Sequence, residues 1–82
     1  MNPAKVQISV VIPCYNEEAI LRGSIEELHA GLLTLKRPFE IIISENGSRD
    51  DTRTIASELQ DQFDEVRALF SDEPNYGKAL RR

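Results

Sequence analysis

The side chains best suited to ligand chemistry stand just after two apolar runs, and they are Tyr15, Glu17 and Asn46. A tyrosine in a loop offers a flat ring on which a nucleobase can stack. The Glu17 carboxylate and the Asn46 amide can accept the N–H of a base or a ribose hydroxyl. The same residue types also serve structure, because tyrosines cover strand ends and Glu and Asn occur in caps and turns. Residue type alone leaves both interpretations open.

The two apolar runs predict strands, and each is followed at once by a polar loop. Phe39 to Ile43 is a nearly continuous apolar run that suits a strand buried on both faces. Ile8 to Ile12 repeats the pattern and leads into Pro13, Cys14 and Tyr15. Open α/β sheets bind their ligands where strands end and polar loops lead into helices. The two exits therefore predict a ligand site at one edge of a sheet.

Leucine and isoleucine spacings of 3 and 4 predict a helix over residues 17–35, with Leu35 on its apolar face. Asn16 is the expected N-cap of that helix, and Pro38 stops the chain from continuing as helix. Pro13 is expected to end the first strand, because proline has no N–H for a central ladder. The complete prediction is strands at 7–12, 39–44 and 66–70, helices at 50–62 as well as 17–35, and a third helix beginning at 78–82. This order implies an α/β protein with a Rossmann-like parallel sheet, β-α-β-α-β plus the start of a third helix.

Composition limits the classes of function that the chain can have. Its 82 residues make one small domain or part of a larger one, and its net charge of −4 argues against non-specific nucleic-acid binding. No apolar stretch approaches the ~18 residues that span a bilayer, and no signal peptide is recognisable. One cysteine, Cys14, excludes an internal disulfide and is expected to be a packed, unreactive residue. These features predict a cytoplasmic protein.

Two phosphate-binding motifs fail on inspection. Gly77-Lys78 suggests a P-loop, but Asp72 stands where the first glycine belongs and Ala79 replaces the magnesium-binding Ser or Thr. No GxGxxG follows the first strand, so a dinucleotide fingerprint is absent. A phosphoacceptor receiver domain would need an Asp where Ser71 ends the third strand.

Three segments together resemble family 2 glycosyltransferases. Residues 9–18 resemble the family opening SVVIPxYNEE, and residues 40–52 resemble its EIIVVDDGSxDxT segment. Residues 75–81 resemble its NxGKxxALxxG loop, one residue shorter after the lysine. The resemblance implies the GT-A fold, in which a Rossmann-like nucleotide-binding half is joined to an acceptor half. The chain, 1–82, would be the N-terminal nucleotide-sugar-binding part, truncated before the Asp-x-Asp motif.

The resemblance also implies a set of donor-binding residues: Pro13, Tyr15, Glu17, Glu45, Asn46 and Lys78. Pro13, Tyr15 and Glu17 would line the base and ribose, and Lys78 would lie near the donor phosphates. Glu45 and Asn46 match the usual Asp-Asp pair, whose second acid accepts the N–H of the base. An Asn carbonyl still accepts that bond, but without the strength of an ionised acceptor.

The implied activity is transfer of a sugar from a nucleotide-diphospho-sugar donor to an unidentified acceptor. Mg2+ or Mn2+ is expected in the full-length enzyme, with ligands that lie beyond Arg82 and not in this fragment. No catalytic residue falls within the chain, so we expect it to lack transferase activity alone. The alternatives are a non-catalytic α/β binding or regulatory domain, and a structural fragment whose free sheet edge pairs with another chain. Association into a homo-oligomer fits the same free edge.

Overall fold

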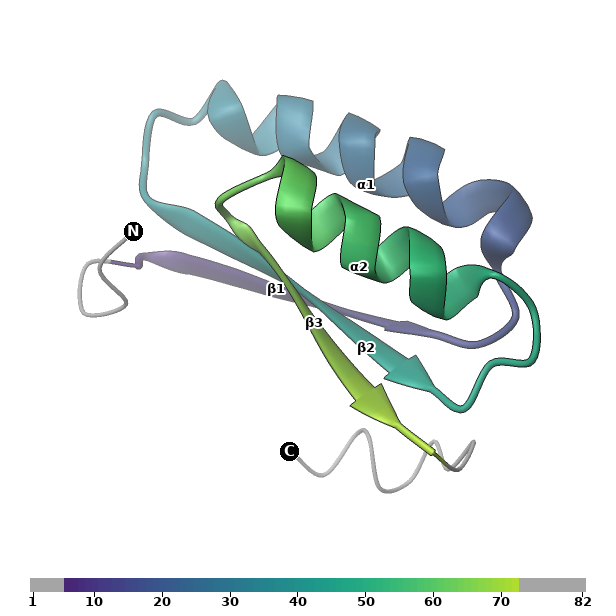
Figure 1. The fold of residues 1–82 in the computed structure, drawn as a ribbon. Helices are drawn as coiled ribbons and strands as arrows, with labels where there is room; N and C mark the ends of the chain where they lie inside the picture. Colours follow the sequence, from purple (N-terminus) through teal and green to yellow (C-terminus); the bar gives the residue numbers. More distant parts are fainter. Residues whose placement is uncertain (1–5, 73–82) are drawn as a thin grey trace.

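The computed structural model describes residues 6–72, which alternate strand and helix along the chain (Figure 1). The elements are β1 (Ile8–Cys14), α1 (Glu18–Leu33), β2 (Phe39–Asn46), α2 (Thr52–Gln62) and β3 (Val66–Ser71). The three strands form one parallel sheet in the order β1-β2-β3. The predicted α/β class and the β-α-β-α-β order are confirmed. The predicted helix at 78–82 lies outside the described residues.

Both helices lie on the same face of the sheet (Figure 1). Crossovers between parallel strands share one hand, so a sheet that grows in one direction receives its helices on one face. Ile41 and Ile43 point to that face and are 0% exposed, whereas Ile42 points to the other and is partly exposed. On this second face Val11 is 56% and Leu69 47% exposed. Ser44 and Asn46 of β2 share this second face and are buried, so among residues 6–72 the prediction that β2 is buried on both faces holds at its carboxyl end and not at Ile42.

The core fills the space between the helices and the sheet. Helix α1 contributes Leu21, Ile25 and Leu32 from one side, as the leucine spacing predicts. Helix α2 contributes Ala56 and Leu59, both of which are 0% exposed. Burial of these faces is the main stabilising contribution, because hydrophobic burial dominates folding free energy.

The strands run past their predicted ends. Strand β1 continues through Pro13 to Cys14, and Pro13 stays in register with Ser44 of β2. The prediction that Pro13 ends the strand is wrong because β1 is an edge of the described sheet, where a missing N–H is tolerated. Strand β2 includes Glu45 and Asn46, so these two polar residues belong to the sheet itself.

Both ends of α1 differ from the prediction. Asn16 is not its N-cap: the residue has a left-handed φ of 52°, and the helix begins at Glu18 after Glu17. The helix ends at Leu33, and Lys36 reverses the chain with a φ of 54°. Leu35 thus leaves the apolar face and is 52% exposed. Tertiary contacts, described below, replace the expected cap.

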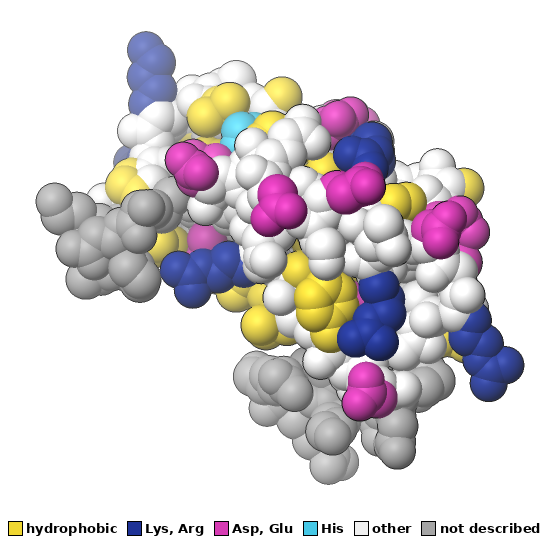
Figure 2. All heavy atoms as spheres, viewed as in Figure 1, with side chains coloured by type: hydrophobic (Ala, Val, Ile, Leu, Met, Phe, Trp, Pro, Cys, Tyr) yellow, Lys and Arg dark blue, Asp and Glu magenta, His cyan; other side chains and the backbone are white. Residues whose placement is uncertain are grey.

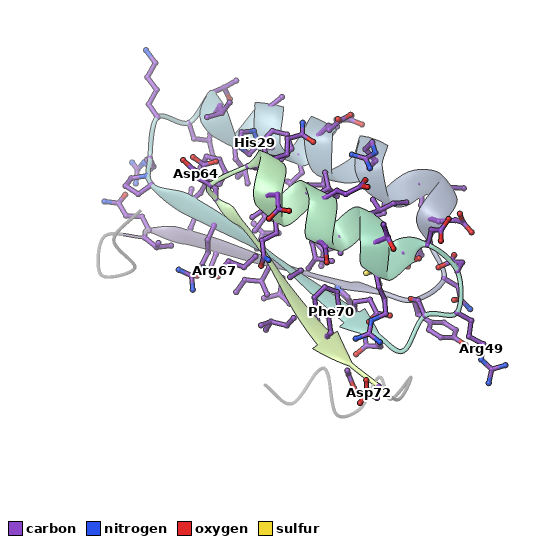
Figure 3. The ribbon with its side chains drawn as sticks, in the orientation of Figure 1. His29, Arg49, Asp64, Arg67, Phe70 and Asp72 are labelled. Carbon is purple, nitrogen blue, oxygen red and sulfur yellow. The ribbon has the colours of Figure 1, made fainter. Side chains whose placement is uncertain are left out.

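His29 closes the other end of the helical layer, far from the strand exits (Figure 3). Its ring stacks on the Phe63 ring, with 4.1 Å between the two centroids. It makes a T-shaped contact with the Phe39 ring, with 5.4 Å between those centroids. Its Nε2 lies 2.8 Å from Glu65 Oε1. The histidine is 9% exposed, so it is a core residue with a polar partner.

The surface in Figure 2 carries acidic and basic side chains interspersed over the helices, without a continuous basic area on that face. Within residues 6–72, no helix has the length and apolar character needed to cross a membrane.

Candidate functional site

The carboxyl ends of all three strands meet at one edge of the sheet. Cys14 of β1 is in register with Glu45 of β2, and Glu45 with Phe70 of β3. Asn46 follows, in register with Ser71. The loops that leave β1 and β2 lie at this same end of the molecule (Figure 1). The structure therefore brings the two predicted strand exits together.

Backbone N–H groups and side chains join the two loops directly. The Asn16 N–H donates to Ser48 Oγ at 2.9 Å, and the Arg49 N–H donates to Asn16 Oδ1 at 2.8 Å. Asn16 with its φ of 52° and Gly47 with a φ of 70° supply the tight bends that these contacts need. This reciprocal pair of bonds fixes the position of the Tyr15 loop (residues 15–17) against the Ser48 loop (residues 47–51).

The start of α1 is capped by residues that precede and open α2. The Glu17 N–H donates to Thr52 Oγ1 at 2.8 Å, and the Glu18 N–H to Asp50 Oδ2 at 3.3 Å. Asp50 Oδ1 accepts the Thr52 N–H at 2.9 Å and also the Thr52 hydroxyl. One carboxylate thus serves the N-termini of both helices, which is a favourable place for negative charge.

These contacts set the ionisation of Asp50. Desolvation disfavours its charged form, but the hydrogen bonds from Thr52 and from the Glu18 N–H outweigh that effect, and the pKa of Asp50 lies below its ordinary value. The carboxylate is therefore charged at neutral pH, as its capping role requires.

Cys14 lies beneath the loops and is 1% exposed. Burial, followed by the nearby charges of Glu17, Glu45 and Asp50, raises the pKa of its thiol to about 12. The thiol therefore stays protonated at neutral pH, and the prediction that Cys14 is a packed residue is confirmed.

Glu45 directs its carboxylate into the protein, and its side chain is 0% exposed. Its Oε2 accepts the Ser48 N–H. Arg53 Nε lies 3.1 Å from Oε1, an ion-pair distance, but without hydrogen-bond alignment, so Oε1 has no hydrogen-bond partner among residues 6–72. Glu45 thus organises the Ser48 loop from within.

Asn46 is 2% exposed, and its Nδ2–H donates to the Ser44 carbonyl at 3.1 Å. A flipped amide would place two oxygens against each other, so this contact decides which end of the amide is which. The Asn46 side-chain oxygen therefore faces away from the Ser44 carbonyl, so the side of the Asn46 amide that faces away from Ser44 is a hydrogen-bond acceptor.

A family model described as "Glycosyl transferase family 2" matches residues 9–82, nearly the whole chain. The chain belongs to glycosyl transferase family 2. The three-stranded parallel unit is consistent with the N-terminal part of a GT-A fold. The resemblance seen in the three sequence segments is thereby confirmed.

Relatives within this glycosyltransferase family include proteins from bacteria and an archaeon. The chain is 34% identical over 79 residues to the undecaprenyl-phosphate 4-deoxy-4-formamido-L-arabinose transferase of Pseudomonas fluorescens, covering 95% of the chain and 23% of that protein. It is 38% identical over 84 residues to the glycosyltransferase AglD of Haloferax volcanii, covering 96% of the chain and 13% of that protein. A match to the Bacillus subtilis "probable glycosyltransferase YdaM" has 32% identity and covers 88% of the chain and 17% of that protein. The chain therefore spans less than a quarter of the length of these relatives.

Five of the six donor residues expected from the family resemblance lie in two groups within the described structure. Tyr15 and Glu17 lie in the Tyr15 loop, both half-buried, and Pro13 precedes them in β1. Glu45 and Asn46 end β2. Lys78 lies outside the described residues. Among residues 6–72, no group of three His, Cys, Asp or Glu side chains could hold a metal ion.

Sequence reasoning missed the residues that join the loops at this edge of the sheet. Asn16 and Thr52 hold the loops together, and Arg53 pairs with Glu45. No local signal identifies them, because each partner lies dozens of positions away or on another element. The sequence placed Asp50 and Thr52 only within the predicted helix at 50–62, so their capping of α1 was not expected.

Proposed function

We propose that this chain forms the nucleotide-binding part of a glycosyltransferase that moves a sugar from a nucleotide-diphospho-sugar donor to an acceptor. One observation carries the proposal. The Asn16–Ser48 and Asn16–Arg49 bonds hold the Tyr15 loop beside the end of β2, so Tyr15, Glu17 and Asn46 gather at one sheet edge. Ligands of open α/β sheets bind at such an edge.

Each of these side chains has a role that its chemistry supports. The Tyr15 ring stacks on the base, a contact worth about 1–3 kcal/mol in single-stranded nucleic-acid complexes. The Asn46 side-chain carbonyl accepts the N–H of the base, because the hydrogen bond from its Nδ2 to Ser44 leaves the oxygen on the other side of the amide. The Glu17 carboxylate accepts a ribose hydroxyl. Pro13 and Glu45 support this surface from the strands, and the family resemblance assigns Lys78 to the donor phosphates.

The proposed reaction also involves a divalent cation. We place the divalent cation, Mg2+ or Mn2+, on an Asp-x-Asp motif after residue 82, where it would offset the charge of the leaving diphosphate. The chain itself is proposed to bind a nucleotide without turnover and to act in the cytoplasm. Among the three relatives described above, only the name of the Pseudomonas fluorescens transferase gives a sugar and an acceptor.

A two-dimensional amide NMR titration tests the proposal. The purified chain is titrated with UDP and then GDP, each with and without Mg2+, and with inorganic pyrophosphate as a control for binding that needs no base. We expect saturable shifts at Tyr15, Glu17 and Asn46 with a nucleotide but not with pyrophosphate. Tyr15→Ala should weaken nucleotide binding roughly 5- to 150-fold.

A folded spectrum that neither nucleotide perturbs would reject the donor-site proposal in favour of a different α/β binding domain. Asn46→Ala removes the proposed acceptor and should weaken UDP binding roughly fivefold, because a hydrogen bond contributes about 1 kcal/mol. Unchanged affinity in that variant would contradict the role given to Asn46.

A further inference from the structure

We propose that Arg53 is a positioning residue for the nucleotide site, acting through the buried carboxylate of Glu45. The inference rests on the proposed function, but it concerns a residue outside the donor set described above. Arg53 is the second residue of α2 and lies at the carboxyl ends of β2 and β3. Three contacts made by its guanidinium support the role.

The first contact is with Glu45. Arg53 Nε lies 3.1 Å from Glu45 Oε1, and the Arg53 side chain is 42% exposed while that of Glu45 is 0% exposed. A fully buried carboxylate without a counter-charge is strongly destabilising, so its neutralising partner matters more than a surface ion pair would. Among residues 6–72, Arg53 is the one cation that pairs with Glu45.

The other two contacts hold the guanidinium in place. Its central carbon lies 5.0 Å from the centre of the Phe70 ring, a cation–π arrangement. Its NH1 lies 3.7 Å from Asp72 Oδ1, which belongs to a 95% exposed side chain. Phe70 and Asp72 both lie toward the carboxyl end of β3 (Figure 3). Arg53 therefore sits between the ends of two strands, with its position set from the β3 side.

A chain of hydrogen bonds runs from Glu45 to the Tyr15 loop. Glu45 Oε2 accepts the Ser48 N–H, and Ser48 Oγ in turn accepts the Asn16 N–H at 2.9 Å. Asn16 stands between Tyr15 and Glu17 in the sequence. The guanidinium thereby fixes the carboxylate, the carboxylate fixes the Ser48 loop, and that loop fixes the residues proposed to hold the base and ribose.

The test compares Arg53→Met with a matched control, Arg67→Met. Arg67 is exposed, lies toward the other end of β3 and takes part in none of the ion pairs found within residues 6–72 (Figure 3). Both variants lose one positive charge from the same chain. We expect Arg53→Met to weaken UDP or GDP binding roughly tenfold, a usual size for coupling between sites, and Arg67→Met to leave it within about twofold. The nucleotide affinity of Arg53→Lys should lie between those of the parent chain and Arg53→Met, because an ammonium group neutralises Glu45 but lacks the planar guanidinium geometry.

A double-mutant cycle separates positioning from a general loss of stability. If Arg53 acts through Glu45, Arg53→Met should have little further effect on nucleotide affinity in a Glu45→Gln background. An equal loss in both backgrounds would overturn the proposal. If Arg53→Met does not fold, Arg53→Lys takes its place in the same cycle.

Amide NMR signals of the ligand-free chain give a readout that does not depend on nucleotide binding. Arg53→Met, or Arg53→Lys, should shift the amides of Ser48 and Asn16, whereas Arg67→Met should not. If the parent chain binds neither nucleotide, the proposed function fails, and the positioning inference is still decided by these two amides. Unchanged Ser48 and Asn16 signals in the Arg53 variants would overturn it.

Discussion

The bond between Thr52 and the start of α1 gives the sharpest test of how the two loops are held together. Thr52 is 0% exposed, and its hydroxyl accepts the Glu17 N–H at 2.8 Å while donating to Asp50. Thr52→Val keeps the shape of the side chain and removes only the hydroxyl. The partly buried Glu17 N–H then has no hydrogen-bond acceptor, and the Asp50 carboxylate loses one of its hydrogen-bond donors.

The expected cost follows from these two losses. Leaving a buried donor unpaired costs about 1–3 kcal/mol, and the Glu17 N–H is only partly buried, so we expect a loss of roughly 2 kcal/mol in the free energy of unfolding. A small domain has a total of only about 5 kcal/mol at the low end of the usual range. With a urea m value of about 1 kcal/mol/M, the midpoint should fall by roughly 2 M.

Urea unfolding followed by circular dichroism measures this change, with Thr54→Val as the matched control. Thr54 lies in the same helix but is exposed, so its substitution should change stability by less than about 0.5 kcal/mol. Thr52→Ser, which keeps the hydroxyl, should recover most of the loss. Equal midpoints for Thr52→Val and Thr54→Val would refute the structural role assigned to this bond.

Two further predictions concern ionisation. The hydrogen bond from His29 lowers the pKa of Glu65 below its ordinary value of 4.5, so the charged Glu65 stabilises the fold above that pH and its contribution disappears as the pH falls through the lowered pKa. Between about pH 6 and pH 3, the free energy of unfolding should therefore decline less in Glu65→Gln than in the parent chain, and parallel declines in urea titrations would contradict the assignment. The Cys14 thiol, with its pKa raised to about 12, should resist a thiol-specific reagent at about pH 8 until urea unfolds the chain; rapid labelling of the native chain would show that Cys14 is accessible.

The sequence predicted the elements well because their signals are local. The leucine spacing of α1 identifies Leu21, Ile25 and Leu32 as its core face, and all three are buried. The apolar run at residues 39–43 predicted a strand, and β2 forms there. The errors occur where a neighbour decides the outcome. Pro13 stays in its strand because β1 is an edge of the sheet formed by residues 6–72, and strand order in a sheet cannot be seen in a short stretch of sequence.

The candidate site was only partly predictable for the same reason. Tyr15 and Asn46 could be selected by type and by their position after strands. The inward direction of Glu45 was not predicted, because the strand was expected to end at residue 44, whereas β2 continues and places Glu45 on the same face as Ile41 and Ile43. Asn16 has the residue type of a helix cap, yet it adopts a left-handed conformation and bonds to Ser48 and Arg49.

The bonds between the loops also determine when the site can form during folding. They join residues 32, 33 and 35 positions apart, in the pairs Asn16–Ser48, Asn16–Arg49 and Glu17–Thr52. Forming a contact between residues so far apart in the sequence has the entropic cost of closing a long loop. These hydrogen bonds therefore form only when β1 and β2 already lie side by side. The site therefore exists only in the assembled sheet. The unfolded chain has no such site, so a ligand that binds there binds only the folded chain and should raise the free energy of unfolding by mass action.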